Sequence, residues 1–168
     1  MEQSYVSSID LRSLRDALGR FASGITVITG MVDSVPTGFT CQSFYSVSLA
    51  PPLVSFCVMR TSKSWPGIRL SRRFTVNVLS EEQQAVSDAF AKSGSDKWKH
   101  VDWAAHPSGK AIIAKTLMWS DCSLHSEQEL GDHFLIIGKV EEMSPVDWNG
   151  HRNPLIYFRG QYRQLQSS

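Results

Sequence analysis

Small and hydroxyl-bearing side chains are concentrated in residues 35–53, which read VPTGFTCQSFYSVSLAPPL. Small residues allow a backbone to approach a flat ligand closely, and hydroxyl and amide groups donate and accept hydrogen bonds. The stretch therefore suits a heteroaromatic cofactor whose ring edge needs many hydrogen bonds. An ordinary polar strand and turn of a β-rich protein has the same composition, so the stretch alone leaves both interpretations open.

A second candidate follows about two dozen residues later, where Thr61-Ser62-Lys63-Ser64 precedes Trp65-Pro66. Proline in the first turn is typical of a helix start, and the free N–H groups, hydroxyls and Lys63 there could hold a phosphate. The alternative is a serine N-cap beside a solvated lysine. Because a nucleotide contains both a ring and a phosphate, the two neighbouring candidates support each other.

A third candidate is Gly131-Asp132-His133, which enters an apolar run. Gly and Asp favour a turn, and an imidazole titrates near neutral pH, so His133 could face a ligand or could be a hydrogen-bonded structural histidine. The other histidines lack metal-ligand spacing, and Cys41 has no nucleophile signature, so a packed thiol is expected there. No glycine-rich dinucleotide loop, Walker loop or serine-hydrolase elbow occurs.

Hydrophobic spacing predicts the elements that must position these residues. Helices are expected after the N-cap Asp10 as far as Gly24, at 65–71, and at 81–91, where Ser80 and Gln83 have capping-box spacing. Strands are expected at 25–29, 53–59 (apolar enough for burial on both faces), 74–79, 114–126, 133–142, 155–158 and 161–163, with 35–53 as a strand or extended turn and 93–109 as a surface excursion. Since no βαβ alternation is seen, one antiparallel β-rich domain is predicted, a barrel with helices at its ends.

The composition is that of an ordinary globular protein. The 168 residues are 42% hydrophobic and 20% charged, and 17 basic against 16 acidic side chains leave a net charge of +1. This balance argues against a nucleic-acid surface or a polybasic membrane patch. Three widely spaced cysteines, no signal-peptide pattern and no long apolar segment predict a cytoplasmic protein with no membrane association.

Six ordered segments resemble the short-chain flavin reductase family. They are FASGITVIT at 21–29, GFTCQSF at 38–44, SLAPPLV at 48–54, FTVNVL at 74–79, GDHF at 131–134 and PLIYFRGQY at 154–162. The resemblance covers about residues 10–165 and implies a single flavin reductase-like domain over 1–168. It implies a mainly β fold with peripheral helices, an antiparallel Greek-key split β-barrel known as the FMN-binding split barrel, usually in a homodimer with flavin near the subunit interface.

The resemblance also implies an activity. Family members reduce FMN or FAD with NADH or NADPH, and the reduced flavin diffuses to a separate monooxygenase, often one that hydroxylates an aromatic or phenolic ring. The sequences at Cys41–Phe44 and Ser62–Trp65 are most similar to those of reductase components of actinobacterial aromatic or steroid-ring hydroxylases. A non-catalytic flavin-binding or carrier protein and a flavin-dependent biosynthetic enzyme on the same fold remain alternatives.

Carried over residue by residue, the family's flavin site falls on both of the first two candidates. The ring, ribityl chain and phosphate would contact Pro36, Thr37, Gly38, Phe39, Thr40, Gln42, Ser43, Cys57, Val58, Met59, Lys63 and Ser64. His133 would lie near the nicotinamide, with Tyr157 and Arg159 as weaker candidates for NAD(P)H contact. No side chain must act as a nucleophile, because the flavin itself accepts the hydride. Ala89 stands where close relatives can carry a basic residue, which implies fewer phosphate or adenosine contacts and leaves FMN versus FAD open.

Overall fold

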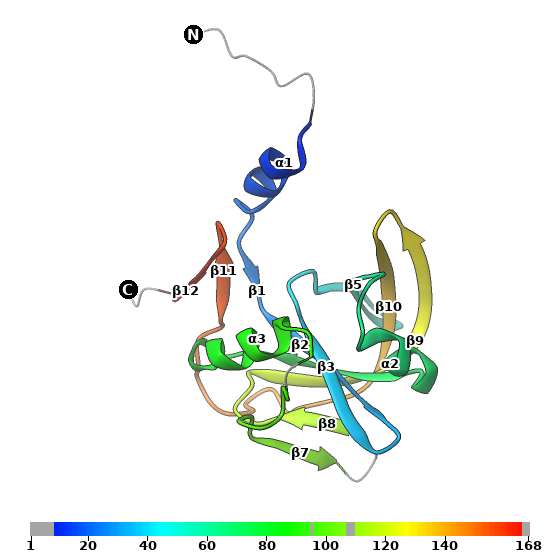
Figure 1. Ribbon diagram of the computed structural model, residues 1–168. Coiled ribbons are helices and arrows are strands. Elements are labelled where there is room, and N and C mark those ends of the chain that lie inside the picture. Colours follow the sequence, from blue (N-terminus) through cyan, green and yellow to red (C-terminus); the bar gives the residue numbers. More distant parts are fainter. Residues whose placement is uncertain (1–8, 95, 107–109, 166–168) are drawn as a thin grey trace, which may run out of the picture.

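The computed structural model describes residues 9–94, 96–106 and 110–165, and its elements are shown in Figure 1. The helices are α1 (Leu11–Leu18), α2 (Trp65–Ser71), the 3-10 helix η1 (Glu81–Gln83) and α3 (Gln84–Ala91). The strands are β1 (Ser23–Gly24), β2 (Thr26–Val32), β3 (Val35–Cys41), β4 (Tyr45–Leu49), β5 (Pro52–Met59), β6 (Arg73–Val78), β7 (Trp103–His106), β8 (Lys110–Ile113), β9 (Met118–Leu130), β10 (His133–Met143), β11 (Ile156–Phe158) and β12 (Gln161–Arg163).

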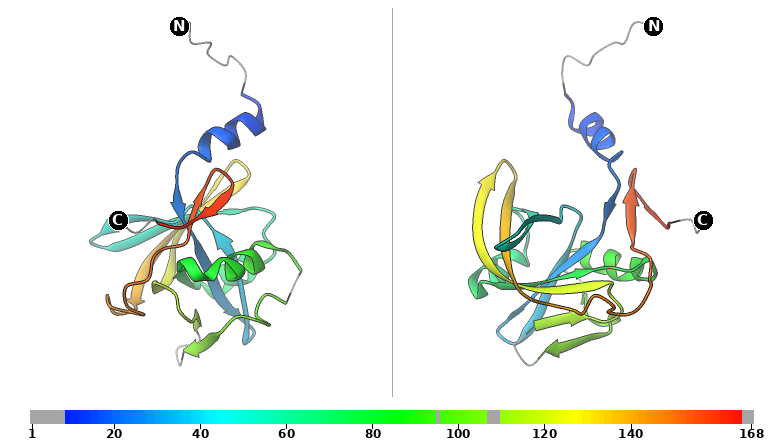
Figure 2. Two further views of the ribbon diagram at one scale, coloured as in Figure 1. Left: turned by 90° about the vertical axis from the view of Figure 1, so that its left-hand side faces the viewer. Right: turned by 180° about the vertical axis from the view of Figure 1, so that it is seen from behind.

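A seven-stranded antiparallel sheet in the order β3-β2-β6-β9-β10-β5-β4 forms the body of the molecule. Its two longest strands, β9 and β10, form a strongly curved hairpin, as Figure 2 shows. The two ends of the sheet approach each other without pairing, and Ser43, just after β3, bridges them through a hydrogen bond with the Cys57 amide of β5 at 2.8 Å. The sheet is therefore a split barrel, and the predicted fold class is confirmed.

Short hairpin turns set the register of the strands that reach the site. Asp33 and Ser34 between β2 and β3 both have positive φ (49° and 64°), the pattern of a type I′ turn. Gly131 opens the two-residue turn between β9 and β10 with φ of 60°, which glycine adopts without steric cost. His133 is consequently the first residue of β10 and lies opposite Met59 of β5.

Two apolar clusters stabilise the barrel, and β2 contributes to both. Ile28 packs inside the barrel with the rings of Phe56 and Phe74, which meet edge to face at 5.2 Å. Val27, on the opposite face of β2, packs in the second cluster with Phe90 of α3. The β-branched run at 25–29 is thus a strand buried on both faces, since successive side chains alternate across a sheet.

Helix α1 stands away from the barrel at the end of an extended arm (Figures 1 and 2). Asp10 caps it, because its carboxylate accepts hydrogen bonds from the Arg12 and Ser13 amides. None of its residues is buried, and Leu11 and Leu18 are 81% and 66% exposed. The helix ends at Leu18 rather than at the predicted Gly24, because the chain there forms β1 and pairs with β11.

Three other sequence-based expectations were wrong in part. Residues 35–53 form two complete strands and the start of β5, because they make both ends of the split sheet. The 53–59 strand is not buried on both faces, since Phe56 and Val58 are buried while Cys57 faces a cavity. The excursion at 93–109 includes β7, which pairs with β8, and the strand predicted from 114 begins at 118.

The capping box at Ser80 and Gln83 is confirmed, as is the helix start with Pro66 in its first turn. Within residues 9–94, 96–106 and 110–165, no helix is both long and apolar enough to cross a membrane. The same residues bring together no group of three or more potential metal-ligating side chains.

Candidate functional site

A cavity of about 790 Å³ lies at the split of the barrel and is called the barrel cavity here. Its walls come from β3 and the residues after it, from β5, from the loop before α2, and from the end of α3 and the residues that follow. Of the predicted flavin-contacting residues, it is lined by Thr37, Phe39, Thr40, Gln42, Ser43, Cys57, Val58, Met59, Lys63 and Ser64. Pro36 and Gly38 belong to β3 but do not line the cavity.

The free edge of β3 faces the split. β3 is the end strand of the sheet and pairs with β2 on one side. The Gly38 carbonyl points away from β2 and accepts hydrogen bonds from Ser64 Oγ and Lys97 Nζ, each at 3.0 Å. Backbone groups of alternate residues in a strand point to the same side, so the Thr40 amide and carbonyl also face the split. This edge supplies main-chain donors and acceptors that a heteroaromatic ring can use.

Most hydroxyl groups in the barrel cavity already have protein partners. Ser43 Oγ accepts from the Cys57 amide and donates to the Cys57 carbonyl, and Thr40 Oγ1 donates to the Ser87 carbonyl at 2.6 Å. Ser62 Oγ accepts from the Trp65 amide. These hydroxyls hold the walls in place, so the main chain, rather than the hydroxyl side chains, is the larger source of free hydrogen-bonding groups.

Gly38 allows α3 to approach β3. A Cβ atom at this position would lie 2.7 Å from the Ile28 carbonyl oxygen and 3.0 Å from the Phe90 ring. The glycine is therefore required by packing at the cavity wall. Cys41, three residues later, is buried, as expected for a packed thiol, and desolvation raises the pKa of its thiol.

The charged side chains that line the barrel cavity are lysines. Lys63, Lys92 and Lys97 line it, and among the described lining residues none is acidic. The sequence did not point to Lys92 or Lys97, because Lys92 falls between the predicted 81–91 helix and the 93–109 segment, and Lys97 lies within that segment, which was interpreted as a surface excursion. Their closeness in sequence to the predicted 81–91 helix is the signal that could have pointed to them. Ala89 packs against the second apolar cluster and does not line the cavity.

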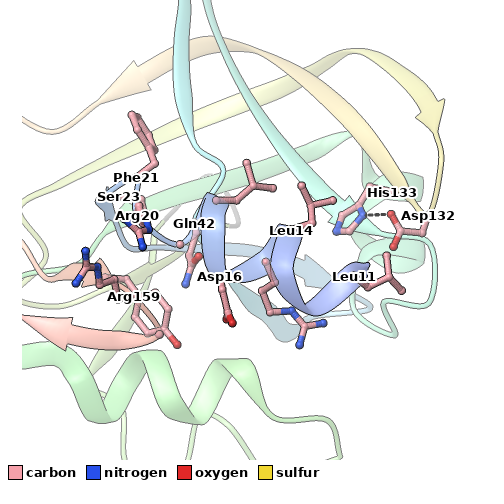
Figure 3. Close-up of a pocket in the computed structure, with 15 residues that line it drawn as sticks. Leu11, Leu14, Asp16, Arg20, Phe21, Ser23, Gln42, Asp132, His133 and Arg159 are labelled. Carbon is pink, nitrogen blue, oxygen red and sulfur yellow. Dashed lines mark hydrogen bonds and ion pairs between the residues drawn. The ribbon is translucent and has the colours of Figure 1, made fainter. Parts of the chain in front are cut away.

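A second cavity of about 890 Å³ lies beneath α1 and is called the arm cavity (Figure 3). The three predicted nicotinamide-side residues, His133, Tyr157 and Arg159, line it. Gln42 and His133 also line the barrel cavity, so the two cavities adjoin at these side chains. The structure thus brings Gln42, predicted for the ring side, and His133, predicted for the nicotinamide side, to one boundary, whereas Tyr157 and Arg159 line only the arm cavity.

The polar residues of the arm cavity are held by the turns that carry them. His133 Nδ1 and Asp132 Oδ1 are 2.7 Å apart, and this hydrogen bond lowers the pKa of the Asp132 carboxyl. Arg159 lies in the β11–β12 turn with φ of 52°, and its amide donates to the Gly19 carbonyl at 2.8 Å. Tyr157 packs edge to face on Tyr162 at 5.2 Å.

Known proteins resemble the chain over nearly all of its described length. The reductase subunit HsaB of a flavin-dependent monooxygenase from Mycobacterium tuberculosis is 45% identical over 160 residues, 95% of this chain and 85% of that protein. A flavin reductase from Pseudomonas putida is 40% identical over 157 residues, covering 93% of this chain and 91% of its own length.

Solved structures show the same similarity. Nitrilotriacetate monooxygenase component B from Mycobacterium thermoresistibile superposes with a TM-score of 0.88 at 42% identity, over 92% of this chain and 86% of that one. The Streptomyces globisporus NADH:FAD oxidoreductase SgcE6, in complex with NAD and FAD fragments, superposes with a TM-score of 0.84 at 32% identity, over 96% and 98%. The family model described as "Flavin reductase like domain" matches residues 18–166, and the chain therefore belongs to this family.

Proposed function

We propose that this protein is an NAD(P)H-dependent flavin reductase that reduces FMN or FAD by hydride transfer and supplies the reduced flavin to a separate monooxygenase. The observation that carries the proposal is the shared boundary of the two cavities at Gln42 and His133. Hydride transfer requires two rings in contact, and adjoining sites can hold them so. Family membership and the reductase subunits among the relatives support the same reaction.

The barrel cavity suits a flavin. The exposed edge of β3, including the Thr40 main chain, offers alternating donors and acceptors to the polar edge of the isoalloxazine ring. Cys57, Val58 and Met59 form the β5 wall, and Lys63 with Ser64 would meet the phosphate. When bound, the flavin supplies the N5 atom that accepts the hydride. Main-chain donors at the ring edge would favour the additional negative charge of the reduced ring.

The arm cavity would hold the nicotinamide nucleotide. Arg15, Arg20 and Arg159 line it and can pair with phosphate oxygens, since guanidinium groups match them geometrically. His133 would orient the nicotinamide at the boundary, with Asp132 fixing the imidazole through its hydrogen bond. Tyr157, already packed on Tyr162, would form a flat wall. Both NADH and NADPH are compatible with these groups.

We also propose a homodimer in which α1 of each subunit covers the partner. Leu11 and Leu18 of α1, and Phe21 just after the helix, are each more than 60% exposed, and an apolar face in this position needs a surface to cover it. Because α1 walls the arm cavity, the dimer would complete the nicotinamide side. The three free cysteines suit a reducing compartment, which supports a cytoplasmic location. A single domain over 1–168 is also part of the proposal.

The reaction partner would be an oxygenase acting on an aromatic or phenolic substrate. The relatives include reductase components of monooxygenases, among them one for 4-nitrophenol from Rhodococcus opacus at 32% identity. Transfer of the flavin by diffusion requires no permanent contact between the two proteins. We therefore expect the purified reductase to reduce flavin without its partner.

Nicotinamide oxidation at 340 nm, with NADH and NADPH each tested with FMN, FAD and riboflavin, provides the test. We expect oxidation that depends on added flavin with at least one nicotinamide. Flavin fluorescence quenching without nicotinamide oxidation would instead identify a carrier. Conversion of an organic substrate without any oxygenase partner would identify a biosynthetic enzyme. Absence of both flavin binding and flavin-dependent oxidation would overturn the proposal.

A further inference from the structure

The lining of the barrel cavity carries more positive charge than a single phosphate contact needs. Lys63 comes from the loop before α2, whereas Lys92 and Lys97 come from the residues after α3. No carboxylate lines this cavity among its described residues, and none of the three lysines forms an ion pair within the described part of the chain. The cations thus come from two separate segments.

Lys97 joins these two segments. Its Nζ donates to the Gly38 carbonyl at 3.0 Å and to the Phe90 carbonyl at 3.4 Å. Ser64 Oγ donates to the same Gly38 carbonyl at 3.0 Å. The predicted phosphate loop and the lysine after α3 therefore meet at one oxygen atom of β3.

The position of Lys97 is held by packing rather than by charge. Trp98 packs edge to face on Phe90 with 4.8 Å between ring centroids, and Trp103 packs on Trp98 at 5.1 Å. The two carbonyl partners of Lys97 are neutral, and partial burial lowers the pKa of its ammonium group. A half-buried cation without a carboxylate is stabilised when an anion binds beside it.

We propose that Lys92 and Lys97 form a second anion subsite, so that the cavity selects a dinucleotide flavin whose diphosphate lies between Lys63 and these two lysines. The inference rests on the proposed function, because it concerns the flavin cavity. A flavin mononucleotide places its negative charge at one phosphate, which Lys63 and Ser64 can meet. Cations on two facing segments match charge spread over two adjacent phosphates.

The subsite also changes the interpretation of Ala89. An uncharged residue at this position implied fewer contacts to the flavin's phosphates or adenosine. Ala89, however, packs against the second apolar cluster and does not line the barrel cavity. Lys92 and Lys97 supply positive charge from a different place. Gly94 also lines the cavity, and a Cβ atom there would meet nothing within 4 Å, so the wall is not closely packed at this residue.

Flavin affinities of single variants test the subsite. Riboflavin, FMN and FAD are titrated with the full-length protein, and the dissociation constants are measured by fluorescence quenching without nicotinamide. For Lys92→Met we expect FAD to bind about tenfold more weakly, while FMN changes by less than about threefold and riboflavin is unchanged. Lys63→Met should weaken FMN and FAD alike. Lys99→Met is the matched control, because Lys99 is exposed and does not line the cavity.

Lys97→Met should repeat the Lys92→Met pattern, with its melting temperature measured to detect a lost fold. If Lys97→Met does not fold, the Lys92→Met result alone tests the subsite, since the Lys92 side chain makes no hydrogen bond within the described residues. If the Lys92 and Lys97 variants lose FMN affinity and FAD affinity equally, or bind flavins as Lys99→Met does, the proposal is overturned. Weaker competition by NAD⁺ with unchanged FAD affinity would assign the lysines to the nicotinamide nucleotide and also overturn it. A wild-type protein that binds no flavin at all would instead refute the proposed function.

Discussion

The two cavities share a boundary but are built in different ways. Paired strands and two apolar clusters support the barrel cavity, and its charged wall consists of lysines. The arm cavity is walled on one side by a helix with no buried residue, and its charged groups are three arginines and two aspartates. One chain is thus sufficient to shape the barrel cavity, the proposed flavin site, whereas the proposed nicotinamide site would be completed by whatever covers α1.

The largest expected contrast is between two glycines. Gly38→Val in β3 would force a side chain against the Ile28 carbonyl and Phe90, at distances that leave no room for it. We expect it to lower the free energy of unfolding by about 3 kcal/mol and to abolish flavin binding. A Cβ atom at Gly24 in β1 would meet nothing within 4 Å, so Gly24→Val should change the free energy of unfolding by less than about 0.5 kcal/mol.

Urea denaturation followed by tryptophan fluorescence measures both glycine variants. Similar unfolding curves for the two would show that the barrel wall is as adaptable as the arm. The contrast between a closely packed barrel cavity and a loosely supported arm cavity would then be wrong.

The second contrast separates the functions of the two cavities. Leu11→Asp combined with Leu18→Asp places charge on the exposed face of α1, which also lines the arm cavity. We expect a monomer whose nicotinamide oxidation falls about tenfold, while flavin affinity changes by less than about threefold, because burying the new carboxylates against a partner is unfavourable. Sedimentation, steady-state kinetics and fluorescence quenching measure the three quantities.

Arg12→Ser is the control for the arm, since Arg12 is an exposed position on the same helix. It should leave the dimer and the kinetics unchanged. A double leucine variant that loses flavin affinity as strongly as nicotinamide oxidation would show that the arm supports both cavities equally.

The third contrast lies within the barrel cavity, between hydroxyls with and without partners. Ser43→Ala removes the group that accepts from the Cys57 amide and donates to its carbonyl, so we expect a loss of about 1 kcal/mol in unfolding free energy. Thr61→Ala removes an exposed hydroxyl with no side-chain hydrogen bond in the described structure and should have no measurable effect. Equal unfolding free energies of the two variants would show that the hydrogen bonds between Ser43 and Cys57 do not stabilise the barrel at its split.

The parts of the site that local sequence could predict are those set by turns and caps. Gly131 and Asp132 predict a turn before an apolar strand, and the observed hairpin places His133 at the boundary of the cavities. The capping box at Ser80 and the proline start of α2 were likewise recognisable, because the interacting groups lie within a few residues of one another.

The rest depends on contacts between distant residues. Ser43 has the composition of a ligand-binding hydroxyl, but its partner in β5 engages it. Lys97 became part of the cavity because Trp98 folds back on Phe90, and no local pattern reports that packing. The leucine spacing of α1 predicted a helix, yet spacing alone does not say whether its apolar face meets the same chain.

The smallest expected effect compares the lysines of the barrel cavity with the arginines of the arm cavity. Burial holds the pKa of Lys97 below its ordinary value of 10.5, so this side chain loses its proton at a lower pH than an exposed lysine. Arginine stays protonated throughout the same range. FAD affinity should therefore fall by about threefold as the pH rises through this lowered pKa, while NAD⁺ affinity stays constant. Lys97→Arg keeps the charge and should flatten the FAD profile. An unchanged slope in that variant would mean that the ionisation belongs to another group, and that the lysine wall does not distinguish the two cavities.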